Sequence, residues 1–480
     1  MGKSLLESYK NRLSISEAVH QKTHNGAKMN SNKKLMIAAV LDNTARFMNE
    51  AFDSSAAMQR SALGDFKKFC LNVSTVALPN LILPELMLTQ PMTSISGYVT
   101  YLRYTAGTAK GAITENTVFN DPYKYGKMNE DRVNYTSQKV VELVAPEAIE
   151  IAPAWTPVVD NKVIGITAEG KEEVIVLKDG KATVDAGKYV KIKYEYDNVV
   201  IPQNKIATLK AEMTSIDLHA HARRIAVYYS QIAAFQAKTD YGYDIAEMLS
   251  NQAQGELAYE IDTEGVMLLD KGAELNKTLK FESYEMANQN TYISRSQYYE
   301  MFNEIISRAK KVIYDRTQKF APNYMVIGTN VLTIMPYVKG WTAAPASTVN
   351  GPFYAGTVDG LKVYCSPAIN ENKFFFGVNG NDLQTSAAVY APYMAVVPTQ
   401  LLGFADGGMS QGFSTMYDMK LLSTYNRDAK GNKVDTIGAR PASEVASSEI
   451  GQYSYLLVAG LFVTNANDKA LIESPSVYAD

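Results

Sequence analysis

One stretch of the chain, GYVTYLRY at residues 97–104, constrains the fold most because it is apolar on both faces. Its β-branched and aromatic residues predict a β-strand, in which successive side chains point to opposite faces. One face carries Tyr98, Leu102 and Tyr104. The other carries Val99 and Tyr101. Neither face is suited to water, so both need cover.

The residues that follow this strand, 105–138, are rich in Gly, Asn and Lys and predict a long excursion without a core of its own. A two-stranded ribbon is marginal in water, and an exposed apolar strand invites aggregation. The strand therefore makes sense if a neighbouring subunit covers it. The 31 Tyr against 2 Trp fit such a surface, because Tyr combines an apolar body with a polar tip.

The first half of the chain alternates between polar, helical and strand patterns. Residues 1–30 are polar and predict a mobile arm, and the apolar positions over 33–50 predict a helix. Short alternating runs with Gly and Asp turns over 140–202 predict a small all-β domain.

The second half predicts long elements. Alternation over 213–230 predicts one long strand, and apolar residues at helical spacing over 244–269 predict a long helix. A second helix should begin at Ser294, where Ser294 and Gln297 form a capping box. Further strands should follow from 324 onward, so the fold class is α+β.

Composition excludes several classes of protein. The 480 residues, 46% of them hydrophobic, can form a sizeable core, and the net charge of -3 gives no general attraction to nucleic acid or anionic membrane. Cys70 and Cys365 are too few for a disulfide framework or a cysteine zinc module. With no signal-peptide pattern at the start and no run long enough to cross a bilayer, we expect a soluble protein from a reducing compartment.

The best enzyme motif is GMSQG at 408–412, which matches the G-x-S-x-G nucleophile elbow. That elbow needs a helix after it and a later histidine. Here a strand-like pattern follows, and all four histidines precede Ser410. We therefore interpret the motif as a Gly-rich turn between strands. With no Gly-rich phosphate loop either, the sequence predicts no enzyme and no cofactor.

A metal site is the remaining chemical candidate. On a strand, Asp217, His219 and His221 share a face and could converge on a metal ion. A metal-dependent hydrolase built on these residues stays open as an alternative. The competing interpretation is a polar strand face or a subunit contact, because no further ligand is evident.

Several segments in a fixed order resemble tailed-phage major capsid proteins, most closely the major head proteins of T-even-type myophages. LPNLILPELMLTQPMT followed by GYVTYLRY is similar to that family's "IPNL…VQPMTGPTG" passage. The likeness continues through RIAVYYS, AAFQAKTDYGYDIAEMLSNQAQGELAYEI and NYMVIGTNVL. It ends with FYAGTVDGLKVYCSP, FFFGVNG and VYAPYMAVVPTQLL.

The resemblance implies the HK97 capsid fold and a division of the chain into named parts. These are an N-terminal arm (1–70), a segment leading into the E-loop (71–97), the E-loop (98–138), an inserted β domain (139–203), a peripheral domain with a long spine helix (204–324), an axial domain (325–400), and return strands with a C-terminal tail (401–480).

The resemblance also implies function and partners. The chain would assemble into hexamers and pentamers of an icosahedral head shell in the host cytoplasm and enclose double-stranded DNA without sequence-specific binding. It would have no membrane partner, and scaffold, portal and decoration proteins would be further partners. An encapsulin-like bacterial nanocompartment on the same fold is the alternative. Candidate subunit-interface residues are Pro91, Met92, Tyr98, Tyr101, Leu102, Tyr104, Tyr123 and Tyr125.

Overall fold

The computed structural model divides the chain into two compact units. Unit 1 comprises Met1–Val99, Ile216–Tyr314 and Phe320–Asp480, and unit 2 comprises Thr100–Ser215 and Asp315–Lys319. The structure describes residues 2–23, 28–53, 71, 75, 78–108, 113, 115–116, 135, 139–144, 150–151, 161–185, 187–197, 207–240, 242, 245–287, 293–317, 320–345, 351–380, 385–399, 402–404, 407–422, 424–427, 433–437, 452–454 and 456–464.

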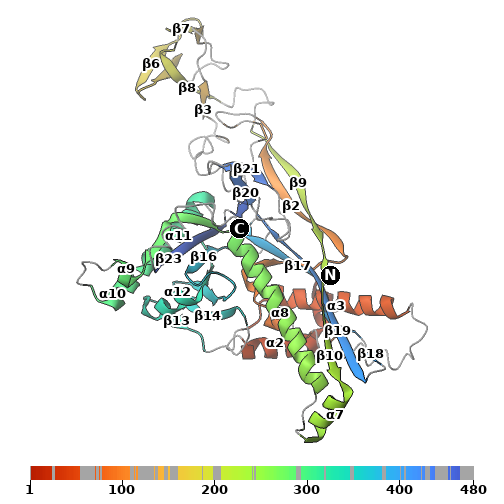
Figure 1. The fold of residues 1–480 in the computed structure, drawn as a ribbon. Helices are drawn as coiled ribbons and strands as arrows, with labels where there is room; N and C mark the ends of the chain where they lie inside the picture. The colour runs from red at the N-terminus through yellow and green to blue at the C-terminus, as the bar shows by residue number, and fades with distance from the viewer. Residues whose placement is uncertain are drawn as a thin grey trace. The chain divides into compact units, whose positions relative to one another are not determined.

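A seven-stranded sheet, called the central sheet below, supplies much of the core of unit 1 (Figure 1). Every residue of three of its strands is buried, as expected of apolar strands covered on both sides: β23 (Leu457–Val463), β16 (Lys373–Gly377) and β12 (Tyr324–Ile327). In sheet order the seven strands are β11 (Glu274–Glu282), β23, β16, β12, β15 (Leu361–Cys365), β14 (Phe353–Val358) and β13 (Thr342–Ala343).

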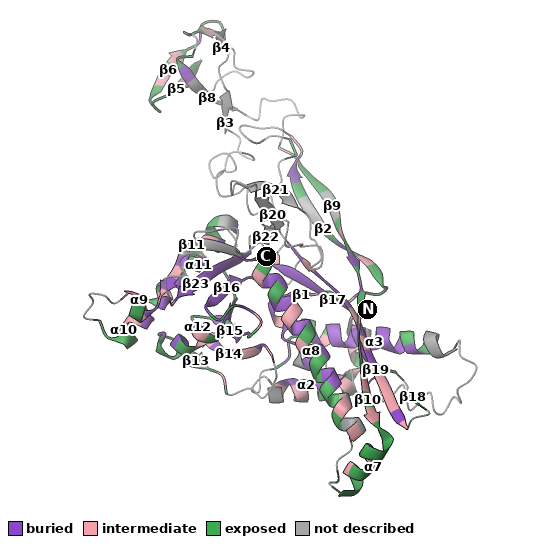
Figure 2. Cartoon of the chain, in the orientation of Figure 1, coloured by how far each residue is buried: buried purple, intermediate pink, exposed green. Residues whose placement is uncertain are grey.

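A second sheet of unit 1 carries two long helices. Its strands are β1 (Leu88–Thr89), β17 (Ala388–Pro398), β19 (Gly408–Leu421) and β10 (His221–Ser230), and β18 (Leu402–Gly403) also pairs with β19. Helix α8 (Ile245–Gly272) packs on β10 and β19, and helix α3 (Ser31–Asp53) packs on β17. Both helices lie where apolar spacing predicts them. Figure 2 shows burial concentrated in β16, β17, β23 and the inner faces of these helices.

The N-terminal residues are not the mobile arm that their polarity predicts. They form helices α1 (Gly2–Ser8) and α2 (Lys10–Thr23), and Leu13, Ser16 and His20 are buried. The hydroxyl of Ser16 donates to the carbonyl of Thr75 at 2.9 Å. The prediction was wrong because the few inward side chains of α2 are mostly polar and leave no apolar stripe to detect.

The capping box at Ser294 and Gln297 is confirmed: the Ser294 side chain accepts from the Gln297 backbone N–H, and the Gln297 side chain accepts from the Ser294 backbone N–H. The helix that it opens is interrupted at Met301, which separates α10 (Arg295–Glu300) from α11 (Phe302–Thr317). The remaining helical elements are η1 (Leu78–Asn80), α5 (Leu83–Leu86), α7 (Gln231–Asp240), α9 (Tyr284–Ala287), α12 (Thr329–Ile334) and η5 (Met335–Tyr337).

Unit 2 contains the strands predicted over 140–202. Four of them form an antiparallel sheet in the order β3 (Lys139–Val144), β8 (Tyr189–Asp197), β5 (Lys162–Thr167) and β6 (Glu172–Val176). Strand β4 (Glu150–Ile151) pairs separately with β7 (Ala182–Thr183). The described core of the four-stranded sheet consists of Val163, Leu177, Ile192 and Tyr194.

The apolar strand at 97–104 is confirmed as part of β2 (Ser96–Ala106), which pairs with β9 (Leu209–His219) in a two-stranded ribbon. The single strand predicted over 213–230 is wrong, because the chain breaks at Ala220 and enters β10, which pairs with β19 instead. The backbone N–H of Ala220 donates to the carbonyl of Ile95 at 2.8 Å. A three-stranded sheet, β21 (Lys433–Ile437), β20 (Thr424–Arg427) and β22 (Gln452–Ser454), completes the described strands.

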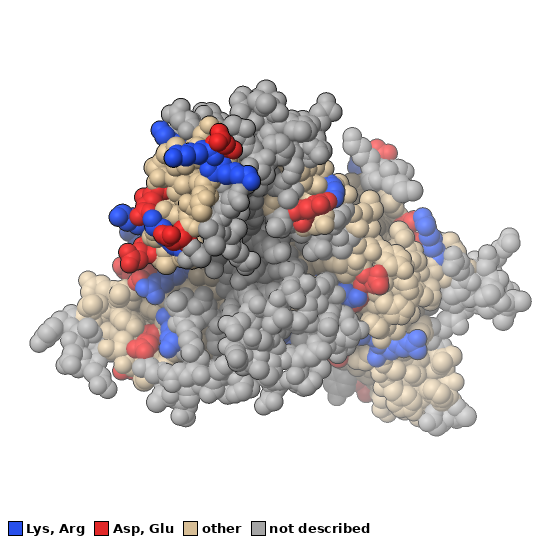
Figure 3. All heavy atoms as spheres, turned by 90° about the horizontal axis from the view of Figure 1, so that it is seen from above, with Lys and Arg blue, Asp and Glu red and all other residues tan. Residues whose placement is uncertain are grey.

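Charges of both signs are interspersed on the described surface seen in Figure 3. This mixture agrees with the formal net charge of -3. Among the described residues, no helix is both long enough and apolar enough to cross a membrane.

Candidate assembly surfaces and a buried polar network

The metal candidates lie at the break between β9 and β10. The rings of His219 and His221 meet edge to face with centroids 5.3 Å apart, and both side chains are exposed. Asp217 is also exposed, and its backbone carbonyl accepts from the Lys420 ammonium. Within the described part of the chain, no three His, Cys, Asp or Glu side chains are grouped to hold a metal ion. The structure brings the two imidazoles together without a third ligand.

Asp418, a buried acidic residue beside this pair, accepts hydrogen bonds from the backbone. Asp418 accepts from the His219 N–H at 2.8 Å and from its neighbour Met419 N–H at 2.8 Å. Burial raises the pKa of Asp418, although these bonds and the Lys420 charge oppose the shift. Asp418 thus stabilises the backbone where β9 ends, and this is a structural role rather than a catalytic one.

The G-x-S-x-G motif forms no nucleophile elbow. Gly408, Ser410 and Gly412 all lie in β19, where Ser410 is paired with Tyr228 of β10. The predicted turn is also wrong, because the motif is the first part of the strand itself and the chain turns just before it. A serine on a regular strand lacks the strained turn that exposes the nucleophile in hydrolases.

The β2 strand has one face covered by its own chain at its root. Val99 is 3% exposed and packs with Met92, Leu218 and Ala220 in a small apolar cluster of unit 1. Tyr98, on the opposite face, is 72% exposed. The strand is therefore predicted correctly. At the start of the strand, however, only the face that carries Tyr98 is exposed and open to a neighbouring subunit.

The other predicted interface residues differ in how far they are exposed. Pro91 is half-buried, whereas Tyr104 of unit 2 is 45% exposed. The side chains of Tyr101 and Leu102 lie outside the described part of the structure, and Tyr123 and Tyr125 lie outside the described residues altogether.

A buried segment, LPNLILPEL at 78–86, precedes β1 and creates a demand for hydrogen bonds. Two prolines restrict it to a 3₁₀ turn (η1) and the single helical turn α5, with Pro84 in the first helical positions. Leu81, Leu83 and Leu86 are nevertheless fully buried. Backbone groups in such a short irregular segment have few internal partners, and leaving them unpaired in the interior is costly.

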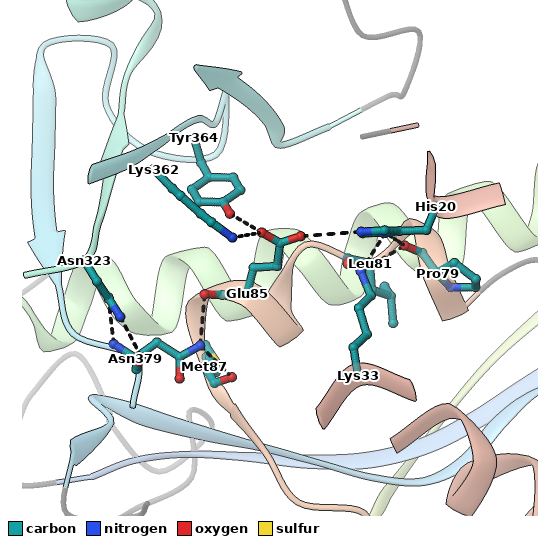
Figure 4. A network of polar contacts seen from close by, with 10 residues as sticks. All are labelled: His20, Lys33, Pro79, Leu81, Glu85, Met87, Asn323, Lys362, Tyr364 and Asn379. Carbon is teal, nitrogen blue, oxygen red and sulfur yellow. Dashed lines mark hydrogen bonds and ion pairs between the residues drawn. The ribbon is translucent and has the colours of Figure 1, made fainter. Parts of the chain in front are cut away.

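Lys33 of α3 supplies two of these bonds (Figure 4). Its ammonium donates to the carbonyls of Pro79 and Leu81, both at 3.0 Å, and lies 3.3 Å from Nδ1 of His20. Two of the ammonium's three N–H donors thus have carbonyl acceptors in the segment. Burial lowers the pKa of Lys33 to about 8, while Glu85 and Asp262 oppose the shift.

Asp262 of α8 satisfies the start of α5. Its carboxylate accepts from the N–H groups of Ile82 and Leu83 at 3.1–3.2 Å. A carboxylate at a helix N-terminus is favourably placed for those donors. Burial raises the pKa of Asp262 to about 7, against the effect of the two N–H bonds and of Lys33.

Asn379 satisfies the other end of the segment. Its amide donates to the carbonyls of Glu85 and Met87 at 2.9 and 3.2 Å, and its own N–H donates to the side chain of Asn323. The Glu85 carboxylate accepts from the Tyr364 hydroxyl at 2.5 Å and from Lys362 at 3.0 Å. Figure 4 shows these groups converging on the segment from separate elements.

The network connects the N-terminal helices, α8 and the strands of the central sheet to the segment that leads into β2. We did not predict it, although one signal exists. Lys33 is three, four and seven residues before Met36, Ile37 and Val40, and so lies on the apolar face of its helix. Asp262 likewise lies four residues before Val266. A lone charge on an apolar stripe indicates a buried polar partner.

Comparison with known proteins gives a family. A family model described as major capsid protein Gp23 matches residues 63–448. The match, spanning most of the chain, defines the class of protein as a viral capsid shell subunit. The chain belongs to the Gp23 major capsid protein family. No curated protein sequence matches it.

Solved structures similar to the chain are distant. A Microbacterium phage Oxtober96 chain shares 9% identity over 80% of this chain and 91% of its own, with a TM-score of 0.36. The capsid of Myoviridae phage XM1 shares 7% identity over 68% and 86%, with a TM-score of 0.30. An encapsulin complex from Synechococcus elongatus shares 11% identity over 53% and 78%, with a TM-score of 0.32. The family assignment therefore rests on the Gp23 model.

Proposed function

We propose that this capsid protein assembles into hexamers and pentamers in the host cytoplasm and that these form an icosahedral head shell around double-stranded DNA. One observation carries the proposal: the β2–β9 ribbon presents the Tyr98 side chain to solvent although its opposite face, at Val99, is buried by its own chain. Tyr is typical of surfaces that are covered by a partner.

Strand β2 of the ribbon corresponds in this proposal to the start of an E-loop (98–138) that lies on a neighbouring subunit. Residues 139–203 are then an inserted β domain, and α8 is the spine helix of a peripheral domain over 204–324. The remaining parts keep the boundaries predicted from the sequence. Membership in the Gp23 family favours a phage shell over an encapsulin-like compartment.

The buried polar network supports this role by fixing the base of the ribbon. The segment that it holds continues into β1, where Leu88 pairs with Val389 of β17, and then into β2. An arm can contribute binding energy only if its base is rigid, because ordering a loose arm on binding offsets part of the gain.

Substitutions at two adjacent positions of β2 test the proposal. Electron microscopy of the expressed protein shows whether each variant assembles. The wild-type chain should form rings or closed shells. Tyr98→Asp should leave the protomer folded and prevent assembly, because it charges a surface that a neighbour covers. Val99→Asp is the matched control and should unfold the base of the ribbon, because it places a charge in an apolar cluster.

Thermal unfolding separates these outcomes. A Tyr98→Asp protein with an unchanged unfolding midpoint and normal shells would overturn the role of this surface. Wild-type protein that stays monomeric, alone and with scaffold, portal and decoration proteins, would overturn the proposed function. We expect Leu102→Asp, which the alternation of the strand places on the same face as Tyr98, to act like Tyr98→Asp.

A further inference from the structure

Helix α7 has an apolar surface that the described part of the chain leaves open. It is a ten-residue helix with no buried side chain. Ile232 and Phe235 are 69% and 71% exposed, and their spacing of three puts them on one side of the helix. A helix this short is marginal unless an apolar face packs against something. The described part of the chain supplies little such packing for α7.

The strands beside α7 extend this surface. Tyr228 of β10 and Leu402 of β18 are both paired with Ser410 of β19, so the three lie in one row on the same face of the sheet. The ring of Phe404 lies 6.1 Å from that of Tyr228. The side chains of Tyr228, Leu402 and Phe404 are each more than half exposed.

A backbone bond joins the helix to the strands. The N–H of Gln231, the first residue of α7, donates to the carbonyl of Gly407 at 3.0 Å, directly before β19 begins. The apolar side chains of α7 and of the strand row therefore belong to one end of the sheet. We call this group the tip surface; it consists of Tyr228, Ile232, Phe235, Leu402 and Phe404.

The tip surface is large enough for a specific contact. Large apolar side chains each carry on the order of 200 Å², so five that are more than half exposed present roughly 600 Å². This is the upper end of about 300–600 Å² for the largest patch on a typical monomer. A standard interface buries about 800 Å² per partner, so the tip surface could form most of one.

We propose that the tip surface packs against the tip surface of a second copy of this chain about a two-fold axis. The inference rests on the proposed shell function, because a shell surrounds each subunit with copies of itself. Contacts that close a ring are head-to-tail, so rings need a further contact to join one another. A two-fold contact, in which one patch meets itself, provides that join.

The charges of this region permit such self-pairing. None of the five side chains is ionisable near neutral pH, so bringing two copies together opposes no like charges within the patch. The acidic and basic residues of α7 itself are Lys238 and Asp240, one of each sign near its C-terminal end. A two-fold axis can place each opposite its counterpart on the other copy, which makes the rim self-complementary.

Opposite charges at one position test the two-fold contact. Ile232→Glu and Ile232→Lys should each reduce the yield of closed shells about 10-fold or more while rings persist, because like charges then meet across the axis. An equal mixture of the two variants should restore shells, because unlike charges meet. Tyr314→Glu, an exposed position on α11, is the control and should assemble normally.

The outcomes are distinct. Unfolding midpoints should match the wild type, because Ile232 is exposed; recovery in the mixture also shows that both variants fold. Normal shells from either variant alone would overturn the inference. Loss of shells in both variants without recovery in the mixture would also overturn it, and would assign the surface to a different partner, including residues 54–70 of this chain. Wild-type protein that forms neither rings nor shells counts against the proposed function instead.

Discussion

The seven-stranded sheet of unit 1 and the four-stranded sheet of unit 2 are built by opposite patterns of burial. In β16 all five residues are buried, whereas β6 alternates exposed and half-buried positions along its length. Phe374, Phe375 and Phe376 of β16 are fully enclosed by both sheet neighbours and helices. Val174 and Val176 of β6 are both more than half exposed.

The difference teaches where the free energy of folding is concentrated. Stability scales with the apolar area removed from water, and unit 1 gathers most of that area in one continuous cluster. The small sheet has four buried apolar residues in its described core. We therefore expect unit 1 to determine the global unfolding midpoint, and unit 2 to open at lower cost.

The largest effect should come from the central sheet. Phe375→Ala should lower the free energy of unfolding by about 3–5 kcal/mol, because it leaves a cavity in the core that packs on the face of the sheet. Denaturant unfolding followed by circular dichroism measures this change. Val174→Ala on the exposed side of β6 is the control and should stay within about 0.5 kcal/mol. A similar loss in both would remove the distinction between the sheets.

The next effect concerns the buried charge in unit 1. The folded pKa of Asp262 is about 7, above its ordinary 3.8. The proton on this carboxyl therefore stabilises the fold fully below about pH 3.8, and that contribution is lost as pH rises through about 7. Asp262→Asn keeps an acceptor for the Ile82 and Leu83 N–H groups and cannot ionise.

Relative to wild type, Asp262→Asn should thus gain stability between pH 4 and pH 8, by on the order of 4 kcal/mol. Unfolding midpoints measured across that range test the sign. Parallel curves for the two proteins would show that Asp262 stays ionised throughout, and that burial does not control its titration.

The smallest of the three effects belongs to unit 2. Val163→Ala in β5 should cost about 2 kcal/mol and act locally. Hydrogen exchange should speed up at the amides of β5 and β8 and remain unchanged in β16. Equal acceleration in β16 would mean that the two units unfold as one, and would contradict the comparison.

Periodic elements could be predicted from the sequence because their pattern is local. Helix α8, the capping box at Ser294 and the strands of unit 2 all follow from spacing within a few residues. The break at Ala220 could not be predicted, because the alternation continues through it. What ends β9 there is the change of pairing partner, which depends on residues two hundred positions away.

The buried network escaped prediction for a related reason. Lys33, Asp262 and Asn379 act on backbone groups of a distant segment. The spacing of Lys33 and Asp262 on their helices indicates that each needs a buried polar partner, but it does not reveal which segment supplies that partner. Strand β2 was predictable only in part. The strand itself was predictable from Tyr98 and Val99, but the cover over Val99 comes from residues near 220 and 390.

The network also has a consequence for the timing of folding. The carbonyl of Glu85 receives its bond from Asn379, which lies 294 residues later in the chain. At about 5–20 residues per second of synthesis, roughly 15–60 s pass between the two. During that interval the LPNLILPEL segment has left the ribosome without its last partner. The base of the ribbon can therefore become rigid only near the end of translation, after most of the subunit has been made.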